Sequence, residues 1–198
     1  MTTESDLEAA LAKAKTELSR WHSPAAFIKR VQEMDGLIES AVLFTKPNIN
    51  FLFDALVLAE FVKLRPVEQV RLAGTREEWP DGFVGNQKAF ENVEVTEIME
   101  PGRKRGDEYR RMVDNSKSPP DRPEDWRARA AKIPAALEAG IMKKVQKNYG
   151  TKPLLLVYLN IGDYGLMQGE TKAAIAELKA RYSGSFREIW IIWQGLLY

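Results

Sequence analysis

The first 65 residues carry apolar side chains at helical spacing. These side chains recur every three or four residues, which places them along one face of a helix. Ser5 and Glu8 have the spacing of a capping box at the start of a first helix, and Ser23-Pro24 is a typical start for a second one. A third, strongly apolar helix is predicted from about residue 50 to residue 64. We expect the stripe of the first helix to be covered by the rest of the chain or by a second copy. It consists of Leu7, Leu11, Leu18 and Trp21.

After Pro66 the pattern changes to the two-residue alternation of strands. Three short strands with short polar links are typical of an antiparallel meander. Farther along, a helix begins at Pro123 and should be kinked or split at Pro134. Another helix then connects two buried strands, which should therefore run parallel. The five predicted strands lie near residues 70–74, 81–85, 92–98, 153–160 and 187–196.

This order of elements, αβββαβαβ, predicts an α/β domain with a mixed five-stranded sheet flanked by helices. We assign the domain to residues 50–198 and a helical N-terminal extension to residues 1–49. A chain of 198 residues with 44% hydrophobic residues can bury a core of its own.

Composition limits the chemistry that this chain can perform. The absence of Cys excludes disulfides, thiolate zinc sites and a Cys nucleophile. With a single His, His22, an active site must use carboxylates, hydroxyls, Lys and Arg. The polar start and the short apolar runs predict no membrane partner and a cytoplasmic location. The net charge of +1 argues against a protein that coats nucleic acid, but it leaves room for a local basic patch.

Three carboxylates are predicted to converge around the meander. If Val84 pairs near residue 92 across the turn, Asp81 and Glu94 lie close on neighbouring strands, provided that they share a face. Glu60 lies on the helix just before. Carboxylate oxygens suit Mg²⁺, which can activate water and neutralise charge on a phosphate. The residues thus predict a Mg²⁺ site made of Asp81, Glu94 and Glu60, in which Asp54 or Glu97 could replace Glu60.

The chain contains a helix with an acid, then a Pro-Asp strand and a Glu-x-Thr strand. Over roughly residues 50–197, this layout resembles that of the PD-(D/E)XK, or restriction-endonuclease-like, nuclease superfamily. The resemblance implies a restriction-endonuclease-like core in which Asp81 and Glu94 bind the metal and Glu60 is the helix acid. Thr96 stands where the family has a Lys that orients or activates the attacking water. Thr carries no charge, and Lys88 or Lys104 could supply the cation instead.

The same residues also have structural interpretations. Pro-Asp-Gly is a common turn, in which Asp81 would serve as an Asx-turn residue. Glu94 and Thr96 alternate as they would on a solvated strand face. These interpretations stay open beside the metal site.

A basic cluster follows the Glu94 strand directly. Residues 103–111 hold five basic and two acidic side chains. Such a cluster can bind phosphate backbones, and an exposed polar loop is the alternative. The predicted nucleic-acid contacts are Arg103, Lys104, Arg105, Arg110 and Arg111.

Three functional hypotheses follow. The first is a Mg²⁺-dependent phosphodiester hydrolase acting on nucleic acid, with Asp81, Glu94, Thr96 and Lys104 in catalytic positions. The second is a catalytically degenerate nuclease-fold protein that binds nucleic acid or a protein partner, which Thr96 favours. The third is a homodimeric module that associates through its N-terminal helices.

Overall fold

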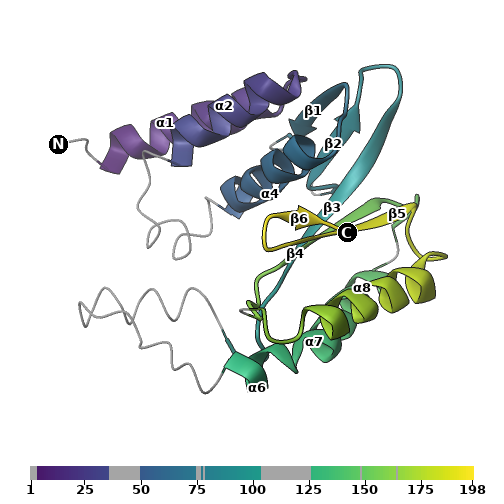
Figure 1. Ribbon diagram of the computed structural model, residues 1–198. Coiled ribbons are helices and arrows are strands. Elements are labelled where there is room, and N and C mark those ends of the chain that lie inside the picture. The colour runs from purple at the N-terminus through teal and green to yellow at the C-terminus, as the bar shows by residue number, and fades with distance from the viewer. Residues whose placement is uncertain are drawn as a thin grey trace. The chain divides into compact units, whose positions relative to one another are not determined.

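A computed structural model describes residues 4–35, residues 50–103 except 75, 76 and 78, and residues 126–198 except 148 and 164 (Figure 1). The chain forms two compact units, Met1–Glu94 and Val95–Tyr198. The boundary lies within a strand, whereas the sequence predicted a division between residues 49 and 50. The N-terminal helices therefore belong to the same unit as the first strands.

The first unit combines helices with the predicted three-stranded meander. The last part of the predicted N-terminal extension, residues 36–49, lies outside the described residues. The elements are α1 (Glu4–Leu18), α2 (Pro24–Asp35), α4 (Asn50–Leu64), β1 (Gln69–Leu72), β2 (Gly82–Gly85) and the beginning of β3 (Phe90–Ile98).

The apolar faces of α1, α2 and α4 are buried within the first unit. Leu11 and Leu18 of α1 are buried, as are Phe27 of α2 and Leu58 of α4. The unit itself thus covers this part of the predicted stripe without a second copy of the chain. Leu58 packs against β2 at Gly82, where an added Cβ atom would lie 2.5 Å from the Leu58 Cδ1. The glycine allows α4 to approach the sheet closely.

Strands β1, β2 and β3 pair as antiparallel neighbours, which confirms the predicted meander. The register differs from the prediction by one residue, because Val84 pairs with Glu91. The ladder ends at the pair Gly82 and Val93, and the N–H of Asp81 also donates to the Val93 carbonyl, at 3.1 Å. Asp81 and Gly82 therefore both lie opposite Val93, which is the arrangement of a β-bulge.

The second unit is built around a parallel strand pair. Strands β4 and β5 are parallel and α8 connects them, as the predicted crossover requires. The predicted split at Pro134 is confirmed, because α7 begins at Ile133 and has this proline in its first turn. Besides the end of β3, the elements are α6 (Trp126–Ala130), α7 (Ile133–Val145), β4 (Leu154–Leu159), α8 (Gln168–Tyr182), β5 (Glu188–Trp193) and β6 (Leu196–Leu197).

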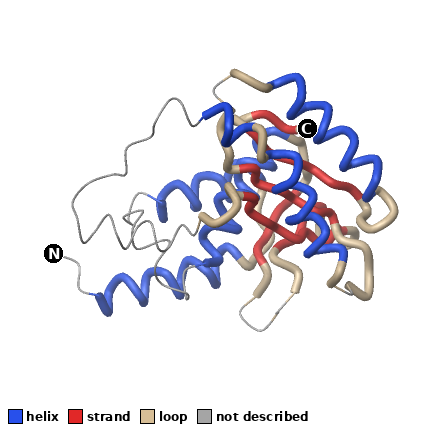
Figure 2. The backbone as a smooth tube through the Cα atoms, turned by 90° about the horizontal axis from the view of Figure 1, so that it is seen from below, coloured by secondary structure: helices blue, strands red, loops and turns tan. Residues whose placement is uncertain are grey.

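Helices α7 and α8 lie side by side in the second unit (Figures 1 and 2). Their buried residues form one core with alternate residues of the strands, among them Leu155 and Val157 of β4 and Ile189 and Ile191 of β5. Side chains alternate between the faces of a strand, so these four residues share one face of the parallel pair.

The prediction of one continuous last strand over residues 187–196 is wrong in its second part. Strand β5 ends at Trp193, and the chain turns at Gln194 and Gly195, whose φ angles are 52° and 73°. Two successive residues with positive φ are typical of a tight hairpin turn. Strand β6 then pairs with β5 in antiparallel orientation.

The described strands thus number six instead of the predicted five, in the order β1-β2-β3-β4-β5-β6. Antiparallel and parallel pairs occur together, so the chain has the predicted mixed α/β character. Within the described ranges, no helix has the length and apolarity needed to cross a membrane. The restriction-endonuclease-like arrangement of the core stays a prediction.

Candidate functional site

A polar cavity of about 210 Å³ in the first unit lies among α1, the first turns of α4 and the segments after β1 and before β2. A water molecule occupies roughly 30 Å³ in the liquid, so the cavity has room for a hydrated ion or a small polar group. Its polar lining residues in the described part of the chain are Lys15, Asn50, Asp54, Glu77 and Asp81.

Asp54 and Asp81 reach this cavity through two local features of the backbone. Asp54 lies one turn before Leu58 on α4, and residues four apart share a helix face. Because Leu58 is fixed against Gly82, Asp54 is directed toward the start of β2. Asp81 sits at the bulge, where its carbonyl accepts from the N–H of Ala73 at 3.1 Å. Bulges commonly redirect a side chain beside a functional site.

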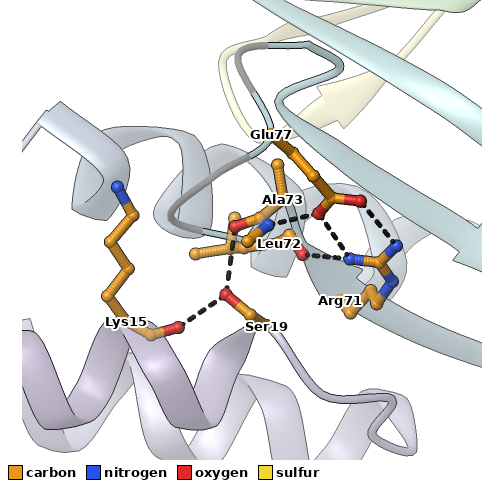
Figure 3. A network of polar contacts seen from close by, with 7 residues as sticks. Lys15, Ser19, Arg71, Leu72, Ala73 and Glu77 are labelled. Atoms are coloured by element: carbon orange, nitrogen blue, oxygen red, sulfur yellow. Dashed lines mark hydrogen bonds and ion pairs between the residues drawn. The ribbon is translucent and has the colours of Figure 1, made fainter.

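Lys15 brings an ammonium group to the cavity from α1. Its Nζ lies 5.5 Å from the centre of the Phe51 ring, a cation–π contact with the first turn of α4. Ser19 fixes the end of α1 beside the cavity, because its hydroxyl lies 2.7 Å from the Lys15 carbonyl and 3.0 Å from the Ala73 carbonyl (Figure 3). The helix end and the segment after β1 are thus held together at the cavity wall.

Glu77 closes one side of the cavity through a network that Figure 3 shows. The Arg71 guanidinium donates to both Glu77 carboxylate oxygens, at 3.0 and 3.4 Å, and the Gly74 N–H donates to the same carboxylate. The hydrogen bonds from Arg71 outweigh the effect of burial and hold the pKa of Glu77 below its usual value. The negative charge of the Glu77 carboxylate is therefore already balanced by hydrogen bonds within the protein.

The structure places the predicted acids differently from the expected cluster. Asp81 lines the cavity, but Glu94, which is buried in β3 with 2% exposure, does not. Glu60 forms an ion pair with Lys63 at 3.4 Å on α4. Asp54, which the sequence offered as an alternative to Glu60, lies in the cavity instead.

The other predicted site residues lie elsewhere or outside the described residues. Thr96 is half-buried in the part of β3 that belongs to the second unit. Lys88 is exposed in the turn between β2 and β3, and Arg103 is exposed after β3. The described chain does not include Lys104, Arg105, Arg110 and Arg111.

Whether these residues suit Mg²⁺ depends on the number of carboxylates required. In the ranges that the structure covers, no group of three or more His, Cys, Asp or Glu residues could hold a metal ion. The expected cluster of Asp81, Glu94 and Glu60 is therefore not found. Mg²⁺ nevertheless keeps several waters and is often bound by one or two carboxylates together with substrate phosphates. Asp54 and Asp81, with the Asn50 amide, fit that mode.

Sequence reasoning missed Lys15, Asn50 and Glu77 as residues of one cavity. Lys15 occurs among the polar positions of an amphipathic helix, and Glu77 lies in a polar link between strands. Neither position carries a local motif. Their convergence depends on the packing of α1 and α4, which no spacing in the sequence records.

Comparison with known proteins identifies no relative. No family model, no curated protein and no solved structure matches the chain. The resemblance to the PD-(D/E)XK superfamily therefore rests on the residues and on the order of elements alone.

Proposed function

We propose that the protein is a Mg²⁺-dependent phosphodiester hydrolase acting on nucleic acid, with the cavity of the first unit as its active site. The observation that supports this proposal is the lining of one cavity by Asp81, Asp54 and Lys15. Asp81 belongs to the Pro-Asp motif, Asp54 takes the place proposed for the helix acid, and Lys15 supplies a cation from a third element.

In this proposal each side chain has a definite task. Asp54 and Asp81 would hold the ion, which when bound activates water and neutralises charge on a phosphate. The Lys15 ammonium attracts the phosphate electrostatically, and the Asn50 amide can orient a hydrated group by hydrogen bonding. Arg71 forms an ion pair with Glu77, so the Glu77 carboxylate repels an incoming phosphate less strongly. Cleavage should be slow, because Thr96 cannot supply the charge of the family Lys.

The test combines metal titration with a cleavage assay. Calorimetry should show weak binding of Mg²⁺ or Mn²⁺, and a labelled oligonucleotide should be cut slowly with metal but not with EDTA. Asp81→Asn and Asp54→Asn each remove a charged oxygen ligand, so each should lower metal affinity and cleavage at least tenfold. Glu60→Gln is the matched control, because Glu60 lies on the same helix as Asp54 but pairs with Lys63. Equal losses in all three variants, or in none, would contradict the assignment of the cavity.

A second candidate is a catalytically degenerate nuclease-fold protein that binds nucleic acid. It is favoured by Thr96 at the family Lys position and by Glu94 lying outside the cavity lining. Thr96→Lys separates the two candidates, since by the resemblance it restores the missing cation. A gain in cleavage supports the hydrolase. If wild type neither binds metal nor cuts, and Thr96→Lys adds nothing, the hydrolase proposal fails and the binding function stands.

A further inference from the structure

The two faces of the β1–β2–β3 ladder differ sharply in chemistry. Residues directly opposite each other on antiparallel strands share a face. One face carries Val70, Leu72 and Val93, which are buried, and Leu58 of α4 packs on this face at Gly82. On the other face the same register places Gln69, Arg71, Phe83, Gly85, Phe90 and Asn92. This second set contains two rings, two amides and one guanidinium, and no carboxylate.

Trp21, from the segment between α1 and α2, joins the rings of the second face. Its ring centre lies 6.4 Å from that of Phe83 and 6.0 Å from that of Phe90, while the Phe83 and Phe90 centres are 5.4 Å apart. We call Trp21, Arg71, Phe83 and Phe90 the aromatic face. Its rings form a connected cluster with edge-to-face and tilted contacts.

Arg71 holds this cluster in place. Its guanidinium carbon lies 3.7 Å from the centre of the Phe83 ring and 5.5 Å from that of Trp21. The same guanidinium is fixed by Glu77 and by the Leu72 carbonyl, at 3.1 Å (Figure 3). A ring cluster fixed in this way is ordered before any ligand arrives, so binding would cost little side-chain entropy.

Phe90 presents the open surface of the aromatic face. Its side chain is 50% exposed, although burying an aromatic ring is favourable by about 1.5–3 kcal/mol. Phe83 beneath it is buried. Two exposed cations are close in sequence, Lys88 two residues before Phe90 and Arg20 directly before Trp21. An exposed ring beside amides and exposed cations, where the Glu77 carboxylate is already paired with Arg71, is complementary to a flat base that carries a phosphate.

We propose that the aromatic face binds single-stranded nucleic acid by stacking unpaired bases on Phe90 and Trp21. Stacking is available to unpaired bases, whereas the bases of a duplex already stack on each other. The binding needs no metal and no cleavage, so it stands whether or not the cavity of the first unit is an active site.

The test measures the affinity for nucleic acid in EDTA, which removes the divalent metal that cleavage in the cavity would require. Fluorescence anisotropy is recorded with labelled single-stranded DNA, single-stranded RNA of the same sequence, and a DNA duplex. Wild type should bind at least one single strand more tightly than the duplex. Phe90→Ala should weaken single-strand binding roughly tenfold, in line with the loss of one stacked base. The DNA and RNA arms identify which strand is preferred.

Three further variants give the measurement its controls. Phe90→Tyr keeps a ring and should bind like wild type, while Phe90→Leu keeps apolar area without a ring and should behave like Phe90→Ala. Leu166→Ala alters another exposed apolar residue, 44% exposed in the second unit, and should change nothing. Circular dichroism verifies folding, which a half-exposed position at the start of β3 should tolerate.

Several outcomes would overturn the proposal. They are equal binding of duplex and single strands, wild-type affinity in Phe90→Leu, and no binding of any strand by the wild type. If the aromatic face instead joins two copies, sedimentation would show a dimer that Phe90→Ala dissociates, with no strand bound. Because EDTA removes the metal that the hydrolase proposal requires, failure of the hydrolase proposal can be told from failure of this one.

Discussion

Two aspartates lie just outside strands in the two units, and their surroundings are opposite. Asp81 precedes β2 and lines a cavity with another aspartate and a lysine. Asp163 follows β4 and is 0% exposed; its Oδ1 accepts from the Gln194 side-chain amide at 2.6 Å and from the Gly165 N–H at 2.9 Å. Asp163 thus ties the loop after β4 to the turn between β5 and β6.

The comparison shows that a position at the end of a strand does not by itself make an acid part of a functional site. The difference is that Asp81 borders a cavity, whereas Asp163 is fully buried. Two amides bond the same oxygen of Asp163, Oδ1, and such partners offset the cost of burying a carboxylate, while its buried Oδ2 has no hydrogen-bond partner among the described residues. Around Asp81 the helices α1 and α4 leave a volume that water or an ion can enter. The first arrangement should contribute stability, and the second should contribute function.

The largest expected effect is the loss of stability on removal of the Asp163 side chain. Asp163→Ala should lower the free energy of unfolding by about 2–3 kcal/mol, because two hydrogen bonds to a charged acceptor are lost. Urea denaturation followed by circular dichroism measures this change.

Two controls sharpen the contrast between the aspartates. Asp163→Asn keeps an acceptor oxygen for both donors and should cost clearly less than Asp163→Ala. Asp81→Ala and Asp54→Ala should each cost less stability than Asp163→Ala, because both side chains are only partly buried, whereas Asp163 is fully buried. If Asp81→Ala destabilised the protein as much as Asp163→Ala, the distinction between the two aspartates would be lost.

A smaller effect is expected from the glycines at which a helix meets a strand in each unit. Gly82 lies on the strand in the first unit, where a Cβ would be 2.5 Å from Leu58 Cδ1 and 3.0 Å from the Arg71 carbonyl oxygen. Gly82→Ala should cost about 1–2 kcal/mol through overpacking. Because Leu58 positions Asp54 one turn away, the variant should also weaken metal binding in calorimetry.

Gly140 is the corresponding glycine of the second unit, but it lies on the helix, α7. A Cβ there would be 1.8 Å from Ile98 Cδ1, the far end of a side chain that can rotate. Alanine in a helix interior gains about 1 kcal/mol over glycine, which partly offsets the clash. Gly140→Ala should therefore cost less than Gly82→Ala and leave metal binding unchanged. An equal loss of metal binding in both variants would contradict the role of Leu58.

The smallest effect concerns acid sensitivity in the two units. Burial raises the pKa of Glu100, but hydrogen bonds from Lys132 at 2.8 Å and Arg129 at 3.0 Å outweigh it, so the pKa lies below its usual value. The pKa of Glu77 is lowered as well, chiefly by its hydrogen bonds from Arg71. A lowered pKa in the folded state contributes stability that is present above the usual value of 4.5 and is lost as the pH falls through the folded value.

Unfolding free energies measured between pH 7 and pH 3 test this difference. Glu100→Gln and Glu77→Gln should each flatten the decline at low pH, by about 1 kcal/mol or less. The effect should be larger for Glu100, whose side chain is 15% exposed and meets two cations, than for Glu77, whose side chain is 39% exposed. The reverse order would show that exposure does not govern these ion pairs.

The kinds of element and their order could be predicted from sequence because they depend on local patterns. Helical spacing before residue 65 and two-residue alternation after it predicted α4 and the meander, and Pro134 predicted the break before α7. The register could not be predicted to the residue, since β2 and the turn after it carry glycine and polar positions that tolerate a shift by one. The turn at Gln194 and Gly195 was missed because it lacks the Asn-Gly or Asp-Gly sequence typical of such hairpins.

The sequence by itself determined a mixed α/β chain, a meander with Asp81 at the start of its second strand, and the absence of any Cys chemistry. Tertiary structure alone decided which charges meet. It placed Asp81, Asp54 and Lys15 around one cavity, left Glu94 and Glu60 outside that cavity, and bonded Asp163 to Gln194. The physical reason is that backbone patterns are set by neighbours along the chain, whereas a site is set by packing. Leu58 against Gly82 fixes where a helix acid lies, and no spacing between the two residues encodes that contact.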